Sequence, residues 1–168
     1  MNSKSGNTRI LKRSLFVCTS ILFMIGIVLF LMPAFFSAMH QSRTVVCKHN
    51  LRTLARAVLL YAEDYDQTLP DGKSWVDQTA SYLQREQSLI YKCPELPDVK
   101  YSYAYHKAIS SKPLSKIISP ETTPMLYDSI TLSKNATDLL TSLPKKGRHS
   151  SCNFIVFTDW HLSPLRTK

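Results

Sequence analysis

The chain has 168 residues, of which 44% are hydrophobic and 20% are charged, with four Gly and nine Pro. This composition excludes a disordered, collagen-like or glycine-rich linker protein, and the length allows one folded domain plus an appendage. The formal net charge of +9 arises in residues 1–62, which hold eight Lys or Arg and no acidic residue. The rest of the chain carries 13 basic and 12 acidic residues, so we expect no nucleic-acid partner.

A long apolar segment lies near the start of the chain. Residues 14–39 contain no charged side chain and exceed the ~20 residues that a helix needs to cross the hydrocarbon core of a bilayer. A cleaved signal peptide is the main alternative, because Lys12 and Arg13 precede the segment and residues 36–38 loosely resemble a cleavage site. The apolar part of a signal peptide is only ~7–15 residues long, however. We therefore predict an uncleaved transmembrane helix over residues 14–39 and a single-pass protein.

The charges that flank this segment do not decide its orientation. The positive-inside rule compares the basic residues on the two sides. They are Lys4, Arg9, Lys12 and Arg13 before the segment, and Arg43, Lys48, Arg52 and Arg56 after it. The comparison is a tie. The cysteines outside the segment fit either one pair plus a free thiol in an oxidising compartment or three reduced thiols in the cytosol.

The apolar pattern becomes periodic beyond the membrane segment. Apolar side chains recur every three or four residues, at Cys47, Leu51, Leu54, Val58, Tyr61 and Tyr65. This spacing predicts an amphipathic helix with one core-facing stripe, beside which basic residues form a solvated face. Nothing between the two segments breaks a helix, so we expect one continuous helix of about 50 residues. The turn residues 70–72 mark the end of this region.

The remaining elements are expected to be short. A helix is predicted over residues 73–86, and a helical turn over residues 138–143. Strands are predicted over residues 99–105, 125–128 and 153–158, the last being an inner strand because it is the most apolar run outside the membrane segment. The predicted fold class is α+β: a transmembrane helix continues into a long amphipathic helix that packs on a small antiparallel sheet.

The order of these landmarks resembles that of bacterial pilin-like proteins. The run CKHNLRTLARAVLLYAEDYDQTLP resembles their signature, and RHSSCNFIVFTDWHL resembles a C-terminal motif in which nine residues separate a His from Asp-Gly-His. Trp160 stands where that motif has Gly. The matching residues are Cys47, Asn50, Leu51, Tyr61, Pro70, Trp75, Cys93, Pro94, His149, Asn153, Asp159 and His161. The chain is therefore similar to type II secretion pseudopilin-like proteins, which are common in planctomycetes and their relatives.

The resemblance implies a pilin-like fold and a location in the bacterial inner membrane. Residues 1–13 would form a cytoplasmic basic tail, and residues 40–168 would form a periplasmic domain that contacts other pilin-like or secretion-system proteins. It also implies a disulfide between Cys47 and Cys93, for which two buried free thiols are the alternative.

The processing site of such proteins is replaced in this chain. Pilin-like precursors have a Gly before a mature start of the type Phe-Thr-Leu-x-Glu, and a Pro 21 residues after that Phe. Counting back from Pro33, the three positions hold Leu11, Lys12 and Phe16. We therefore expect the chain to keep its N-terminus, and assembly into a filament does not follow from the resemblance.

His149, Asp159 and His161 are the best candidates for chemistry, because two imidazoles and a carboxylate can bind Zn²⁺ or iron. No known ligand spacing supports a metal, and we favour a structural role in which Asp159 and His161 bond the turn that ends a strand while His149 packs against them. No nucleophile elbow, P-loop or dinucleotide fingerprint occurs, so we expect neither an enzyme nor a cofactor. The leading hypothesis is a membrane-anchored structural or interaction protein. The alternative is a membrane-tethered periplasmic binding or metal-dependent module that uses these three residues.

Overall fold

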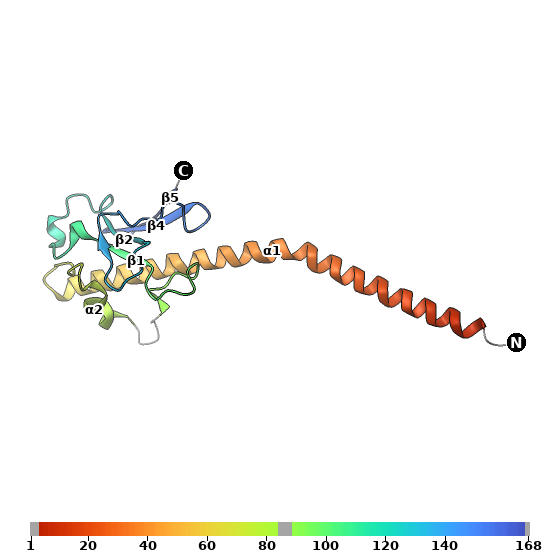
Figure 1. The fold of residues 1–168 in the computed structure, drawn as a ribbon. Coiled ribbons are helices and arrows are strands. Elements are labelled where there is room, and N and C mark those ends of the chain that lie inside the picture. Colours follow the sequence, from red (N-terminus) through yellow and green to blue (C-terminus); the bar gives the residue numbers. More distant parts are fainter. Residues whose placement is uncertain (1–3, 84–88, 167–168) are drawn as a thin grey trace. The chain divides into compact units, whose positions relative to one another are not determined.

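A computed structural model describes residues 4–83 and 89–166 of the chain, with side chains from residue 15 onward. The chain divides into two compact units, Met1–Gln41 and Ser42–Lys168, and helix α1 (Lys4–Asp64) contributes residues to both (Figure 1). The helix therefore begins earlier than residue 14, within the predicted basic tail. Residues 1–3 of that tail lie outside the described residues.

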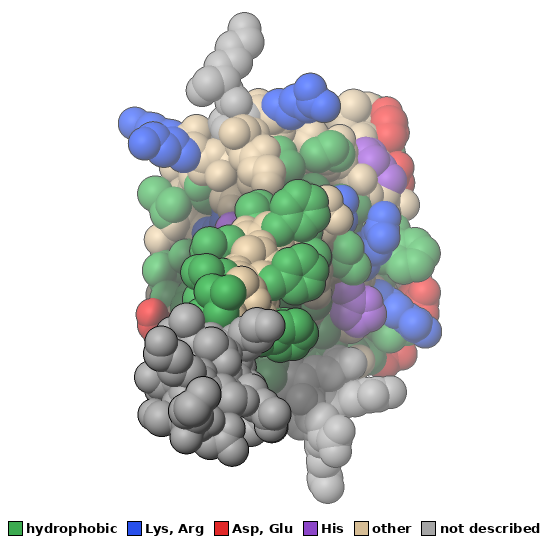
Figure 2. Space-filling view, turned by 90° about the vertical axis from the view of Figure 1, so that its right-hand side faces the viewer, with side chains coloured by type: hydrophobic (Ala, Val, Ile, Leu, Met, Phe, Trp, Pro, Cys, Tyr) green, Lys and Arg blue, Asp and Glu red, His purple; other side chains and the backbone are tan. Residues whose placement is uncertain are grey.

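The first unit consists of the N-terminal part of α1. Its large apolar side chains are exposed, from 38% at Met39 to 82% at Phe30, and Figure 2 shows hydrophobic side chains in green gathered along this segment. The Thr19 and Ser20 hydroxyls donate hydrogen bonds to the carbonyl oxygen of Phe16, so these polar groups are satisfied within the helix. In the described part of the chain, α1 alone is long and apolar enough to cross a membrane, judged by length and composition.

The C-terminal part of α1 belongs to the second unit and follows the predicted stripe. Four of the stripe residues are fully buried: Cys47, Leu51, Leu54 and Val58. Tyr61 is half-buried, and Tyr65 lies just beyond the helix end, exposed and stacked on Tyr61 with ring centroids 4.2 Å apart. Of the basic residues beside the stripe, Arg52 and Arg56 are exposed. The 3.6-residue periodicity thus identified the buried face of the helix.

The second predicted helix is shorter than expected. Helix α2 (Trp75–Thr79) continues as a 3-10 turn over Ala80–Tyr82, and residues 84–86 of the prediction lie outside the described residues. Trp75 is 1% exposed and donates a hydrogen bond from Nε1 to the carbonyl oxygen of Ala136, 3.2 Å away. This bond holds α2 to a distant part of the second unit. Two further 3-10 turns cover Lys107–Ile109 and Leu114–Lys116.

A five-stranded sheet completes the second unit. Its strands are β1 (Tyr103–His106), β2 (Pro124–Asp128), β3 (Thr137–Asp138), β4 (Cys152–Phe157) and β5 (Leu162–Arg166), in the order β3-β1-β2-β4-β5. The fold is α+β, and β4 is an inner strand as predicted. The expectation of a purely antiparallel sheet was wrong, because β3 pairs with β1 in parallel and the sheet is mixed.

Several predicted boundaries were also wrong. The first strand begins at Tyr103 and not at residue 99, because the Ser102 hydroxyl accepts a hydrogen bond from the backbone N–H of Cys93 and residues 99–102 form a loop with one bend. Residues 138–143 contain the end of β3 and then a single turn, in which the N–H of Leu143 donates a hydrogen bond to the carbonyl oxygen of Leu140 at 3.3 Å. Strand β5 was not predicted at all.

The sheet separates two hydrophobic clusters. Tyr103, Tyr105, Phe154 and Val156 alternate along β1 and β4 and pack in the main core with the buried side chains of α1, beside which these strands lie in Figure 1. The residues between them point to the other face, where Ala104, Tyr127, Ala136 and Ile155 form a smaller cluster. The period-2 alternation of strands therefore positions α1 against one face of the sheet only.

Candidate functional site

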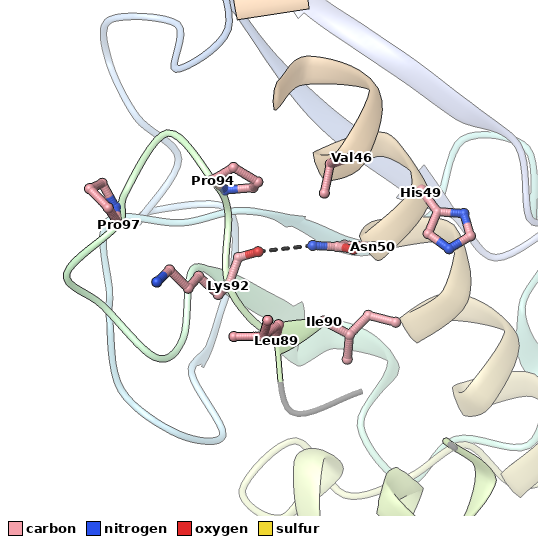
Figure 3. Close-up of a pocket in the computed structure, with 8 residues that line it drawn as sticks. All are labelled: Val46, His49, Asn50, Leu89, Ile90, Lys92, Pro94 and Pro97. Carbon is pink, nitrogen blue, oxygen red and sulfur yellow. Dashed lines mark hydrogen bonds between the residues drawn. The ribbon is translucent and has the colours of Figure 1, made fainter. Parts of the chain in front are cut away.

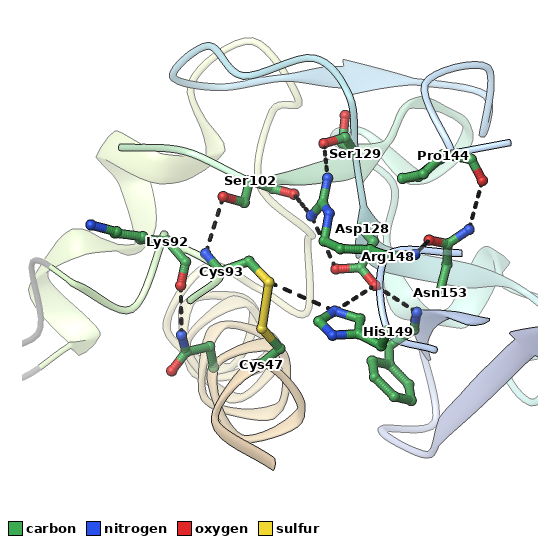
Figure 4. Close-up of polar contacts among 12 residues, drawn as sticks. Cys47, Lys92, Cys93, Ser102, Asp128, Ser129, Pro144, Arg148, His149 and Asn153 are labelled. Atoms are coloured by element: carbon green, nitrogen blue, oxygen red, sulfur yellow. Dashed lines mark hydrogen bonds and ion pairs between the residues drawn. A yellow bond between two sulfur atoms is a disulfide. The ribbon is translucent and has the colours of Figure 1, made fainter. Parts of the chain in front are cut away.

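Buried polar and sulfur-containing side chains gather where α1 meets the sheet. Cys47 comes from α1, Cys93 from the turns after residue 90, Asp128 from the end of β2, and Arg148 and His149 from the loop before β4 (Figure 4). The side chains of Asp128 and His149 are fully buried, and that of Arg148 is 6% exposed. Burial of so many polar groups requires that they pair with one another.

The disulfide implied by the pilin-like resemblance is present. Cys47 and Cys93 are joined across a sequence separation of 46 residues, with their Cα atoms 5.4 Å apart. Next to it the Asn50 side-chain amide donates a hydrogen bond to the carbonyl oxygen of Lys92, at 2.9 Å. The backbone N–H of Cys93 donates to the Ser102 hydroxyl, at 3.0 Å. These bonds fix the loop that carries Cys93 to both α1 and the start of the sheet.

Asp128 is the centre of the polar contacts. One carboxylate oxygen lies 3.2 Å from Nη1 of Arg148, and the other accepts the backbone N–H of Phe154 at 2.7 Å and lies 3.5 Å from Nε2 of His149. The Arg148 guanidinium also donates to the carbonyl oxygens of Ser102 and Ser129. The ion pair is thus almost fully removed from water. The Arg148 guanidinium and the Asp128 carboxylate form hydrogen bonds to backbone groups as well as to each other.

His149 faces the disulfide and the carboxylate with one nitrogen atom. Its Nε2 lies 3.7 Å from Sγ of Cys93 as well as 3.5 Å from Asp128, and its ring packs on Phe154 with centroids 5.0 Å apart. Nδ1 is buried and has no hydrogen-bond partner among the described residues. A catalytic relay of the Cys-His-Asp type uses both ring nitrogens, one toward each partner. The geometry therefore does not form such a relay.

The turn between β4 and β5 holds the other two predicted ligands. The carboxylate of Asp159 accepts the backbone N–H of His161 at 3.1 Å and lies 2.6 Å from its Nδ1, and the His161 ring stacks on Phe157. Burial acts to raise the pKa of Asp159, but the hydrogen bonds from His161 hold it below its ordinary value. Both side chains are partly exposed, at 35% and 44%. Asp159 and His161 thus close a hairpin turn.

The structure does not bring the three predicted ligands together. His149 contacts Asp128 and Cys93, whereas Asp159 and His161 contact each other. In the described part of the chain, one set of three possible metal ligands has its atoms within 4.8 Å of one another, namely Cys47, Cys93 and His149. We call this set the Cys–His cluster. His149 therefore belongs to a candidate metal group, but with two cysteines as its companions.

The other residues of the pilin-like pattern have structural positions. Leu51, Pro70 and Trp75 are buried, and Tyr61 and Pro94 are half-buried. The buried Asn153 accepts the backbone N–H of Arg148 and donates to the carbonyl oxygen of Pro144, so it shapes the loop that carries His149. Trp160 adopts a left-handed backbone with φ 72°, the conformation that Gly adopts most readily.

The sequence did not reveal the roles of Asp128 and Arg148. Asp128 stood at the end of a predicted strand, and the signal available was an acidic residue that directly follows three apolar ones, Met125 to Tyr127. A strand whose side chains are buried on both faces leaves no solvent for such a residue. This position therefore requires a charged partner elsewhere in the chain.

An open groove of about 510 Å³ lies beside the disulfide-bearing loop (Figure 3). Its apolar lining comes from Val46, Leu89, Ile90, Pro94 and Pro97, and its polar lining from His49, Asn50 and Lys92. The Asn50 amide is already bonded to the carbonyl oxygen of Lys92. Among the described residues, the lining of this groove contains no carboxylate, hydroxyl or thiol side chain.

Comparison of the chain with models of protein families, with curated proteins and with solved structures finds no match. The pilin-like resemblance stays a prediction. The structure shows an α+β domain with a buried disulfide and a buried ion pair, preceded by an apolar helical segment.

Proposed function

We propose that this protein is a single-pass protein of the bacterial inner membrane whose pilin-like domain, residues 40–168, lies in the periplasm and works through protein contacts. The observation that carries the proposal is the division of α1. Its first part exposes large apolar side chains, whereas its later part buries Cys47, Leu51, Leu54 and Val58 under a sheet. A helix that is apolar all round needs an apolar environment, and a bilayer supplies one.

The disulfide supports a location outside the cytoplasm. Disulfides persist in oxidising compartments such as the periplasm and are rare among cytosolic proteins. The pair Cys47 and Cys93 joins α1 to the loop before the sheet, so it stabilises the domain and not an appendage. Because the basic residues on the two sides of the apolar segment are equal in number, this pairing is the feature that favours a cytoplasmic N-terminus.

A role in protein contacts fits the distribution of polar groups. The best-connected polar side chains, Asp128, Arg148 and His149, are buried and engaged within the fold. The partners proposed are other pilin-like or secretion-system proteins, as in the family that the sequence resembles. Residues Leu11, Lys12 and Phe16 replace the Gly, Phe and Glu of the processing site, so the protein would act with its N-terminal segment attached.

Reporter fusions at the C-terminus test the topology. Alkaline phosphatase, which is active only in the periplasm, should be active when fused after Lys168, and a reporter that is active only in the cytoplasm should be inactive there. The reverse pattern would refute the proposed orientation. Mass spectrometry of the membrane-extracted protein should find residues 1–11 intact, and a mature start at Lys12 would show that a peptidase does process the chain.

A further inference from the structure

One sulfur and one nitrogen atom of the Cys–His cluster have the spacing of two zinc ligands. In a tetrahedral site, with Zn–S about 2.3 Å and Zn–N about 2.0 Å, a sulfur and a nitrogen ligand lie about 3.5 to 3.6 Å apart. The observed distance from Sγ of Cys93 to Nε2 of His149 is 3.7 Å. The oxygen of Asp128 that faces the same nitrogen lies at 3.5 Å, close to the separation of an oxygen and a nitrogen ligand. The Cys93 sulfur and one Asp128 oxygen therefore each lie at about the distance from Nε2 that separates two ligands of one zinc ion.

The cysteines would supply two sulfur ligands and, as thiolates, two negative charges. The Sγ atoms of Cys47 and Cys93 and Nε2 of His149 all lie within 4.8 Å of one another. With the Cα atoms of the two cysteines 5.4 Å apart, rotation of the side chains is enough to separate the sulfurs after reduction. Two thiolates balance the charge of one Zn²⁺, and the Asp128 carboxylate is balanced by Arg148, so the buried group stays neutral.

We propose that the Cys–His cluster is a thiol-dependent Zn²⁺ site: in the reduced protein both sulfurs and the His149 imidazole bind one zinc ion, beside the Asp128 carboxylate that faces the same imidazole nitrogen. The disulfide form and the zinc form are two states of one location in the fold. Cys₂His with a fourth oxygen donor is a ligand set that zinc accepts. This site goes beyond the proposed function and does not depend on it.

The exchange between the two states balances with a dithiol as the reductant. A dithiol gives two electrons and two protons to the bond between Cys47 and Cys93, and becomes a disulfide itself. The S–S bond breaks and two thiols form. Zn²⁺ then binds both sulfurs and releases their two protons. Because the ligand residues are fully buried, the ion enters as the chain folds.

The experiment loads the metal during folding of the full chain. The protein is made by cell-free synthesis in detergent micelles with Zn²⁺, once with dithiothreitol and once with oxidised glutathione. A Cys18→Ser/Cys152→Ser background removes the two free cysteines, so that thiols outside the cluster contribute nothing. After gel filtration, elemental mass spectrometry should find about one zinc per chain from the reducing synthesis and almost none from the oxidising one.

Variants at position 149 distinguish a ligand from a packing residue. His149→Gln should lower zinc affinity by more than about tenfold, whereas His149→Cys supplies a third thiolate and should retain the metal. A second readout needs no variant: in urea, reduced protein folded with Zn²⁺ should be alkylated at Cys47 and Cys93 more slowly than reduced protein folded without it, as mapped by peptide mass spectrometry. Absence of zinc from the reduced background protein would overturn the proposal. So would equal zinc content in both syntheses, or unprotected cysteines in the presence of Zn²⁺.

Discussion

Replacing Asp128 by Asn tests the buried ion pair most directly. The substitution keeps the size of the side chain but removes its charge and one of its two acceptor oxygens. In the native protein these oxygens serve Arg148 at 3.2 Å and the backbone N–H of Phe154 at 2.7 Å. The Asn side chain must turn an NH₂ group toward one of these donors, so one of them loses its acceptor.

The expected cost follows from the burial of both partners. The side chains of Asp128 and Arg148 are 0% and 6% exposed, so water cannot replace the lost acceptor. Removing one partner of a buried pair typically costs about 3 to 5 kcal/mol, because the other charge remains buried and uncompensated. Arg148 keeps its bonds to two backbone carbonyl oxygens, which favours the lower end, about 3 kcal/mol. A small domain has only about 5 to 15 kcal/mol of stability in total.

The assay is urea unfolding of the full chain in detergent micelles, followed by the fluorescence of the buried Trp75. Arg148→Met and the double variant complete a cycle, in which the double variant should be destabilised by at least about 1 kcal/mol less than the sum of the single variants. Asp77→Asn is the matched control, because it breaks an exposed pair with Lys134 and should change stability far less. Equal effects of Asp128→Asn and Asp77→Asn, or strict additivity in the cycle, would show that the buried pair is not coupled as the geometry requires.

Three further predictions concern the disulfide, one histidine and one strained turn. Cys47→Ala/Cys93→Ala should lower the unfolding free energy by about 4 kcal/mol in chelator-treated protein, since the bond closes a loop with a sequence separation of 46; a loss below about 1 kcal/mol would contradict this. Burial holds the pKa of His106 below its ordinary value of 6.5, so the unfolded state takes up the proton first as the pH falls. The contribution of His106 to the unfolding free energy should therefore be fully present above pH 6.5 and should decrease as the pH falls below it. In His106→Gln, the urea midpoints at about pH 7.5 and about pH 5.5 should differ less than they do in the wild type. Trp160→Gly should be about 1 kcal/mol more stable than Trp160→Ala, because both remove the ring but only Gly relieves the positive φ; equal urea midpoints would argue against strain.

The parts of the fold that the sequence predicts are those in which burial is periodic. The stripe from Cys47 to Val58 is buried because a helix returns the same face every three or four residues. Residues 154–157 are apolar because both faces of this strand are covered by other side chains. Strand β5 lacks such a signal. It is an edge strand that contains Pro164 and is exposed over its last three residues, so neither alternation nor a continuous apolar run identifies it.

The candidate site was predictable only in part, for a related reason. His149 was singled out by its motif, but its partners depend on long-range packing that no local pattern encodes. Asp159 and His161 are two positions apart and their turn brings them together, whereas the side chain of Asp128 approaches His149 only because β2 pairs with β4. A local motif can therefore place neighbours within one turn, but the sheet decides which residues from separate segments meet.

The same geometry explains why landmarks so far apart in the chain belong together. Cys47 lies on the buried face of α1, Cys93 precedes the sheet, and His149 precedes its inner strand β4. The disulfide between Cys47 and Cys93 fixes α1 to the loop before the sheet. His149 packs against this disulfide and so fixes the loop before β4. The Asp128 carboxylate accepts the backbone N–H of Phe154 and so holds β4 itself. Together with Asp128, the cluster thus connects the helix to the adjacent strands β2 and β4. A pair of thiols bound to zinc would make the same connections as the disulfide, so the domain can keep one fold in either chemical state.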